Sequence, residues 1–337
     1  MLFLFGCSTL PPYSSYSTTL HRVNWNGEEL QLRFEQGKIT DLHDLNPEHS
    51  LDYDGYWIAP AFIDSHVHLA YLPVAEAMLD GGISAVVDLA APIGFLESDL
   101  SPLQLKQAGP MVTATLGYPT QGWGSNGYGS ECSNITCIDQ TINTHYSLGA
   151  RVVKLPLTNE PTLNDAQVIQ AVQTAKNLGI PTVAHALSNS QALRAGTLGI
   201  DALAHTPTAP CTSETLSLWE DKYVISTLNA FGSTSAISNL QQMHQSGARV
   251  LYGTDLGNAQ ETGVSLSELN LLQQAGLSNE EIILSGTTLP ADFWGFSDLG
   301  RIEVGYRASF LILDANPQDD ITTLSRPVEV WIDGVKR

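Results

Sequence analysis

The sequence lacks long apolar runs and is poor in basic residues. No apolar run approaches the roughly 20 residues that a membrane-spanning helix needs, so we predict no transmembrane segment. The chain has 15 lysine and arginine residues against 35 aspartate and glutamate residues, which gives a formal charge of −20. This balance argues against nucleic acid and anionic membrane surfaces as partners.

Cysteine is also scarce, with four residues in 337. Cys132 and Cys137 enclose the short segment Ser-Asn-Ile-Thr and can form a disulfide in an oxidising compartment, with Cys211 left over or competing as a partner. A metal site at these cysteines is the less favoured alternative, because no second cysteine pair accompanies them. The remaining cysteine, Cys7, lies close to the start of the chain.

Histidine, lysine and aspartate residues recur at the ends of short apolar runs. His66 and His68 end an apolar run, and on a strand two such residues share one face, so both imidazoles can reach one metal. Each of four later residues also ends a short apolar or β-branched run: Lys154, His185, His205 and Asp255. The alternative is a set of independent polar caps at strand ends. The repetition favours a shared metal site.

The apolar runs alternate with helical patterns, which indicates successive strand-helix units and a parallel sheet. We predict helices over 164–178, with Asn164 as N-cap and Gly179 as the stop, and over 235–244, followed by Gly247. The eight predicted strands are the run into His66, then 83–89, 111–116, 150–155, 182–186, 202–205, 224–228 and 249–253. The fold class is therefore α/β, a (β/α)8 TIM barrel, whose active site lies at the carboxyl ends of the strands.

The residue types suit a zinc centre. Imidazoles and a carboxylate are ligands for Zn²⁺, and an open coordination position lowers the pKa of bound water towards about 7. Lys154 is unusual in this set, because an ammonium cannot bind a cation and the amine must be neutral or chemically altered. A buried lysine paired with a carboxylate is the alternative.

These motifs resemble those of the amidohydrolase superfamily, over nearly everything from about residue 20 onward. Further similar stretches are Gly81-Gly-Ile-Ser-Ala-Val-Val-Asp88, Gly199 to His205, Gly253-Thr-Asp255 and Leu299 to Gly305. The resemblance implies a small discontinuous β-sandwich domain from both chain ends, residues 20–60 and 304–337. The barrel would then occupy residues 61–303.

The resemblance also implies the site chemistry. One zinc ion would bind His66, His68, Asp255 and Lys154, and a second would bind Lys154, His185 and His205, with Lys154 carboxylated by carbon dioxide. A bridging hydroxide would attack the substrate carbonyl, and Asp255 would carry its proton to the departing nitrogen.

The most similar members, imidazolonepropionase-like and Xaa-Pro dipeptidase-like enzymes, imply hydrolysis of a carbon-nitrogen bond in a small amide, dipeptide or cyclic amide. Three alternatives stay open: a mononuclear deaminase, a lactone or phosphotriester hydrolase, and a surface lipoprotein that binds a ligand without turnover. A homo-oligomer is compatible with any of these.

Three weaker predictions concern the surroundings of the site. Asp64 either orients a ligating imidazole or caps its strand. Tyr118 is a candidate catalytic residue that hydrogen-bonds a substrate carbonyl. The glycine-rich loop 118–130, with Trp123 and Tyr128, is either a mobile lid over the barrel mouth or a plain surface loop.

The N-terminal residues resemble the end of a bacterial lipoprotein signal. Leu4, Gly6 and Cys7 match its pattern, and the Pro/Ser/Tyr stretch to residue 19 would be the tether of a lipid anchor at Cys7. Only six residues precede Cys7, and none is basic. We expect a bacterial periplasmic or outer-membrane-anchored lipoprotein, with a cytoplasmic protein as the alternative.

Overall fold

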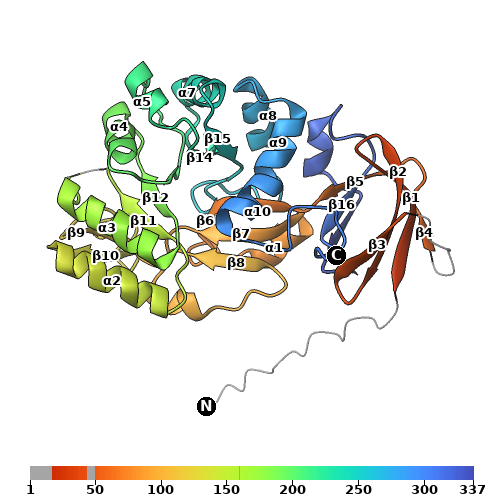
Figure 1. The fold of residues 1–337 in the computed structure, drawn as a ribbon, viewed down its shortest axis with the longest axis horizontal. Helices are drawn as coiled ribbons and strands as arrows, with labels where there is room; N and C mark the ends of the chain where they lie inside the picture. Colours follow the sequence, from red (N-terminus) through yellow and green to blue (C-terminus); the bar gives the residue numbers. More distant parts are fainter. Residues whose placement is uncertain (1–16, 44–49, 159) are drawn as a thin grey trace, which may run out of the picture.

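A computed structural model describes residues 17–43, 50–158 and 160–337 (Figure 1). The predicted lipid anchor at Cys7 lies outside these residues. The first strand begins at Thr18, so the last two residues of the predicted tether belong to this strand. No helix within the described ranges is long and apolar enough to cross a membrane.

The central part of the chain forms ten parallel strands in three ladders. These ladders are β6-β7-β8, β10-β9 and β11-β12-β13-β14-β15. Their bounds are Phe62–Val67 for β6, Ile83–Asp88 for β7, Gln104–Gln107 for β8, Met111–Ala114 for β9, Gly129–Cys132 for β10, Val153–Pro156 for β11, Thr182–His185 for β12, Ala202–Leu203 for β13, Tyr223–Ile225 for β14 and Arg249–Leu251 for β15.

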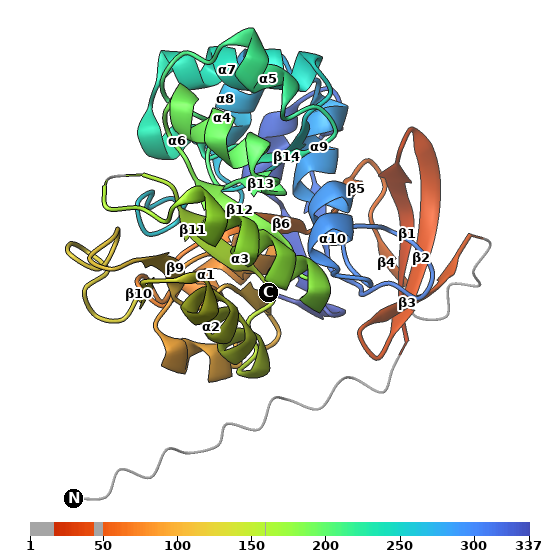
Figure 2. The same cartoon turned by 60° about the vertical axis from the view of Figure 1, so that its left-hand side comes forward.

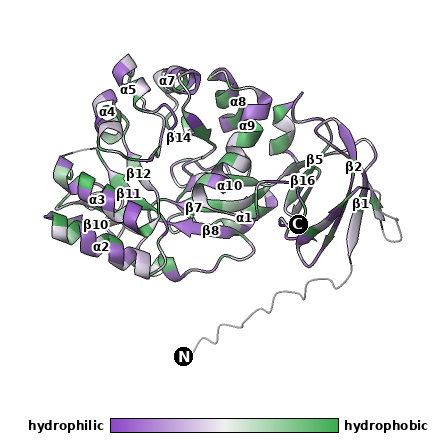
Figure 3. Ribbon diagram, in the orientation of Figure 1, coloured by the Kyte–Doolittle hydropathy of each residue, from purple (hydrophilic) through white to green (hydrophobic). Residues whose placement is uncertain are grey.

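All eight predicted strands have a counterpart, and two strands were missed. Both missed strands lack an apolar run: β8 reads Gln-Leu-Lys-Gln and β10 reads Gly-Ser-Glu-Cys. β8 is coloured largely as hydrophilic in Figure 3. Strand formation here depends on pairing with β7 and β9, which a local pattern cannot reveal.

The arrangement is barrel-like, but the ladders do not join into one closed hydrogen-bonded barrel within the described residues. The first and last parallel strands are nevertheless neighbours. The backbone N–H of Ser65 donates to the carbonyl of Tyr252 at 3.0 Å, and that of His68 donates to Leu256 at 2.8 Å. These bonds bring the ends of β6 and β15 to the same mouth, so the prediction of a (β/α)8 barrel holds as a TIM-barrel-like α/β fold.

Helices surround the parallel strands, with α2 and α3 side by side on the outside (Figure 2). The helices are α1 Ala75–Asp80, α2 Ile135–Ser147, α3 Asp165–Leu178, α4 Asn189–Thr197, α5 Ser213–Ser217, α6 Leu228–Phe231, α7 Thr234–Gln245, α8 Leu266–Gln274, α9 Asn279–Gly286 and α10 Thr288–Trp294, with short 3-10 helices at Ile93–Glu97 and Ile321–Ser325.

Both helices predicted in detail are confirmed. Asn164 caps α3 in a reciprocal pair with Gln167, and Gly179 ends the helix in the left-handed region at a φ of 67°. The second predicted helix, 235–244, is α7 and extends one residue further at each end.

The two ends of the described chain meet in one mixed sheet beside the barrel, in the order β18-β17-β16-β5-β1-β2-β3, with β4 paired to β1 (Figure 1). The strands are β1 Thr18–Trp25, β2 Glu28–Glu35, β3 Lys38–Leu42, β4 Ser50–Asp52, β5 Trp57–Pro60, β16 Phe310–Leu313, β17 Glu329–Ile332 and β18 Val335–Lys336. The sheet curls so that Phe34 contacts Phe310 and Trp331, with ring centroids 5.7 and 5.3 Å apart. The predicted β-sandwich is not confirmed, because these strands form a single curled sheet.

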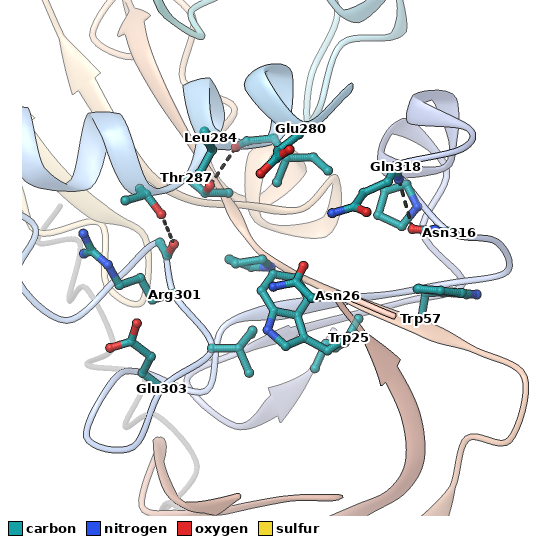
Figure 4. Close-up of a pocket in the computed structure, with 17 residues that line it drawn as sticks. Trp25, Asn26, Trp57, Glu280, Leu284, Thr287, Arg301, Glu303, Asn316 and Gln318 are labelled. Atoms are coloured by element: carbon teal, nitrogen blue, oxygen red, sulfur yellow. Dashed lines mark hydrogen bonds between the residues drawn. The ribbon is translucent and has the colours of Figure 1, made fainter. Parts of the chain in front are cut away.

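A cavity of about 270 Å³ lies where this sheet meets α9 and residues 300–303 (Figure 4). Trp25 and Trp57 line it from the sheet, and Glu280 and Arg301 line it from the barrel side. It shares no lining residue with the predicted metal site. This cavity therefore lies between the mixed sheet and the barrel-like part of the structure.

Cys132 and Cys137 form a disulfide that joins the end of β10 to the first turn of α2, and Cys211 is free. This pairing removes the alternative of a metal site at these two cysteines. We expect reduction of the disulfide to lower the free energy of unfolding by about 2 kcal/mol, since the crosslink restricts the unfolded chain. Thermal unfolding with and without reductant measures this, and the Cys211→Ser variant should keep the full response. An equal melting temperature in both conditions would contradict it.

Candidate metal centre

The structure brings the six predicted ligand residues into one cavity of about 530 Å³ at the mouth of the barrel. Five of them lie near or beyond the carboxyl end of a parallel strand, where the ends of such strands converge, and Lys154 is the second residue of β11. The contributing positions are His66 on β6 and His68 just after it, Lys154 on β11, His185 on β12, His205 after β13 and Asp255 after β15. Their role as ligands stays a prediction, and their proximity is an observation.

His66, His68 and Asp255 form the first group. The two Nε2 atoms lie 3.3 Å apart, and Asp255 Oδ1 lies 3.3 Å from His66 Nε2 and 3.1 Å from His68 Nε2. All three residues are buried. Ligand atoms about 2.1 Å from one zinc ion are about 3.4 Å apart, so the spacing fits a single metal ion.

His185 and His205 form the second group. His185 Nδ1 and His205 Nε2 face each other at 3.0 Å. The His205 ring also lies beside His66, with ring centroids 4.6 Å apart, so the two groups are adjacent. Burial lowers the pKa of His185 to about 3, so its imidazole is neutral and carries a lone pair.

Lys154 lies among these imidazoles with 1% of its surface exposed. Its Nζ has no hydrogen-bond partner among the described residues. Burial lowers its pKa to about 7, so a large fraction of the amine is uncharged at neutral pH. A buried amine without a partner is costly, so Lys154 is a candidate for an interaction or a modification at this site.

Backbone and hydroxyl oxygens fix the orientation of the rings. His66 Nδ1 donates to the carbonyl of Ala204 at 2.9 Å, and His205 Nδ1 lies 3.0 Å from Thr227 Oγ1. A proton on each Nδ1 leaves the Nε2 lone pair facing the cluster, which is the usual arrangement around zinc. The His66 and His205 rings are therefore oriented so that Nε2 can bind a metal.

The Asp64 carboxylate accepts hydrogen bonds from backbone N–H groups and a hydroxyl, and none from an imidazole ring among the described residues. Its carboxylate accepts the backbone N–H of His66 at 3.0 Å, and it accepts the N–H and hydroxyl of Thr254 at 3.1 and 2.6 Å. It therefore ties the end of β6 to the segment that carries Asp255. Of the two interpretations of Asp64, the structure supports the strand-end cap.

Asp255 itself has left-handed backbone geometry, with a φ of 55°. This region is unfavourable for residues other than glycine, and it recurs at functional sites where neighbours hold it in place. The backbone N–H of Asp255 donates to the carbonyl of His66 at 2.9 Å. This hydrogen bond supports the strained backbone of Asp255 and also fixes Asp255 beside His66.

Sequence reasoning did not assign a role to Asp88 at the end of β7. This buried carboxylate accepts backbone N–H groups of Leu69 at 2.7 Å, Ala70 at 3.3 Å and Ala90 at 3.1 Å. It holds the segment that follows His68. A lone acid at the end of the apolar run Ile83 to Val87 was the available signal.

Sequence analysis placed Trp123 only in the candidate lid loop, and it did not assign Phe231. Trp123 packs against His68 with ring centroids 5.7 Å apart, and its indole N–H donates to the Tyr118 hydroxyl at 2.7 Å. Phe231 packs on His205 at 4.8 Å. Loop 118–130 therefore contacts the metal-capable group directly, through an aromatic residue whose position depends on the tertiary fold.

An amidohydrolase family model matches residues 57–336 of the chain. The chain belongs to the amidohydrolase family. It is therefore a hydrolase acting on carbon-nitrogen bonds, from a family that is generally metal-dependent. No curated protein sequence matches the chain significantly.

Solved structures share this fold at low sequence identity. A Xaa-Pro dipeptidase with methionine bound in its active site has a TM-score of 0.81 and 18% identity, covering 96% of this chain and 100% of that chain. A putative prolidase from Bifidobacterium longum has a TM-score of 0.79 and 19% identity, covering 97% and 95%. The ochratoxinase of A. niger has a TM-score of 0.76 and 15% identity, covering 95% of each chain.

We expect Asp88→Asn to weaken zinc binding about 10- to 100-fold, as loss of an outer partner of a metal site typically does. An amide cannot accept all the N–H groups that the carboxylate accepts, so the segment after His68 loses support. Metal titration by calorimetry measures the effect. Asp319→Asn, an exposed change, is the matched control. Equal zinc affinity in the two variants would show that Asp88 does not position the site.

Proposed function

We propose that this protein is a two-metal hydrolase of amide-like substrates, with Asp255 as the proton carrier and Lys154 as the link between two ligand groups. The observation that carries this proposal is the buried Nζ of Lys154, which has no hydrogen-bond partner among the described residues and lines the same cavity as two adjacent sets of metal-capable side chains. Neither set alone explains why a lysine is buried there.

The residues present fit two divalent ions, and zinc suits their imidazole and carboxylate donors. His66, His68 and Asp255 would hold one ion, and His185 and His205 would hold the other. Lys154 completes both sets if its neutral amine combines with carbon dioxide, because the resulting carbamate offers one oxygen to each side. The lowered pKa of Lys154 supports this reaction, since only the uncharged amine is nucleophilic.

Metal ions in such a site supply an activated water near neutral pH and polarise a carbonyl oxygen. Asp255 is placed to accept the proton of the attacking water and pass it to the departing nitrogen. Burial raises the pKa of Asp255, but the adjacent imidazoles outweigh burial and hold the pKa well below its usual range. The carboxylate is therefore ionised at neutral pH.

Tyr118 is placed to donate a hydrogen bond to the substrate carbonyl. Its hydroxyl oxygen already accepts the Trp123 indole N–H, and its ring lies 5.2 Å from the His185 ring. Burial raises the pKa of Tyr118, so the phenol stays protonated. The hydroxyl proton is then available to a substrate in the cavity.

The alternatives left open by the sequence have weaker support. A mononuclear deaminase has no use for a buried amine beside four imidazoles, so Lys154 counts against it. No specific observation favours a lactone or phosphotriester substrate. Ligand binding without turnover does not require a strained carboxylate between two imidazoles.

We expect Asp255→Asn to lower kcat by about 10²- to 10⁴-fold while KM changes little, because a proton carrier acts in the transition state more than in substrate binding. Steady-state kinetics at matched metal content measure both constants. A proportional rise in KM would instead assign Asp255 a substrate-binding role.

We expect Lys154→Ala to reduce bound metal and activity together, because neither ligand group keeps its shared member. Metal content by elemental analysis and turnover are measured on the same preparation. Lys176→Ala, which changes an exposed lysine on α3, is the matched control and should retain both. Full metal occupancy in Lys154→Ala would refute the linking role.

A further inference from the structure

Among the described residues, the wall of the active-site cavity outside the predicted metal ligands carries no charge. Nine lining residues remain once those six are set aside: Tyr71, Met111, Tyr118, Trp123, Thr158, Leu187, Phe231, Gly257 and Asn258. We propose that the substrate is an uncharged amide, carbamate or urea with an aromatic or apolar substituent and no free carboxylate near the scissile bond. This inference rests on the proposed function and narrows its substrate class.

The lysine and arginine side chains other than Lys154 do not line the cavity. All 15 lysine and arginine residues lie in the described part of the chain, and Lys154 alone lines the cavity. Several others pair with acids far from the mouth, such as Arg194 with Asp165 at 2.8 Å and Arg301 with Asp292 at 2.7 Å. A substrate carboxylate would therefore find no arginine or lysine partner along the cavity wall.

The energetic consequence favours neutral ligands. A carboxylate buried against this wall, away from the proposed metal ions, would have no ion-pair partner and would carry a desolvation cost of several kcal/mol. Hydroxyl and amide donors such as Thr158 and Asn258 offset only part of this cost. The formal charge of −20 further disfavours the approach of anions. We expect a carboxylate to reduce the specificity constant at least about 100-fold relative to a neutral group of the same shape.

The aromatic residues define where an apolar substituent would lie. Trp123 and Tyr71 are 39% and 55% exposed, and their ring centroids are 6.1 Å apart, so their faces are open to the cavity mouth. Tyr118 and Phe231 instead pack against His185 and His205 deeper in the cavity. An aryl group can stack at the mouth while the scissile bond reaches the cluster.

Pairs of compounds that differ only in charge test this inference. The pairs are 4-acetamidobenzamide with 4-acetamidobenzoate, N-acetylphenylalaninamide with N-acetylphenylalanine, and N-acetylalanylprolinamide with N-acetylalanylproline. Hydrolysis by the zinc-loaded enzyme gives kcat/KM, and calorimetric binding to the Asp255→Asn variant gives affinity without turnover. We expect the neutral member to be favoured at least about 100-fold in every pair that is hydrolysed or bound.

A charge variant tests the cause of the preference. Tyr71→Arg places a cation at the exposed mouth, and Tyr71→Gln is the matched uncharged control. We expect Tyr71→Arg to shift the neutral-to-anionic ratio about 3- to 10-fold towards the anion relative to Tyr71→Gln, as expected for a partly exposed ion pair. An unchanged ratio would show that the missing cation does not set the preference.

The outcomes separate this inference from the proposed function. Equal or better use of the carboxylate member overturns the neutral-substrate inference while the two-metal hydrolase stands. Failure of all six compounds to bind also overturns the inferred class, whatever the metal content is. Binding of the neutral members without turnover by the zinc-loaded enzyme supports the cavity inference and contradicts the hydrolase.

Discussion

The burial of a lysine amine and four imidazoles beside one carboxylate is the constraint on which the rest of the structure depends. Such a cluster is unfavourable in a dry cavity unless something binds its lone pairs. Lys154 is the clearest case, because its Nζ has no partner among the described residues. The spacing of the imidazole and carboxylate atoms supports metal ions as the missing partners. Carboxylation of Lys154 would turn a buried amine without a partner into an anionic ligand and remove the conflict.

The fold must hold these buried groups in place although their burial is unfavourable. Parallel strands deliver the side chains to one mouth, but the strand ends alone do not fix them. Asp64 joins β6 to the segment before Asp255, and Asp88 holds the segment after His68. The Ala204 carbonyl and the Thr227 hydroxyl set the ring orientations. Positioning therefore depends on buried hydrogen bonds around the cluster as much as on the cluster itself.

Most parallel strands and the six candidate ligand residues could be predicted from the sequence, because local patterns specify where strands end. His66, His68, Lys154, His185, His205 and Asp255 each end an apolar run, and parallel topology then places them together. What could not be predicted depends on pairing between distant segments. β8 and β10 have no apolar pattern of their own, and the small sheet curls on itself instead of forming the predicted sandwich. The contact of Trp123 with His68 likewise arises from a loop whose path no local pattern encodes.

The cavity combines a strongly polar floor with an uncharged, mostly aromatic and apolar wall, which suits cleavage of a neutral amide-like bond. The central claim is that Lys154 links two metal ions at that floor. It is tested most directly by counting metals per chain in protein purified without chelator, together with the intact mass under gentle conditions. The account predicts close to two divalent ions per chain and a mass increase of one carbon dioxide. One ion per chain with an unmodified lysine would contradict it.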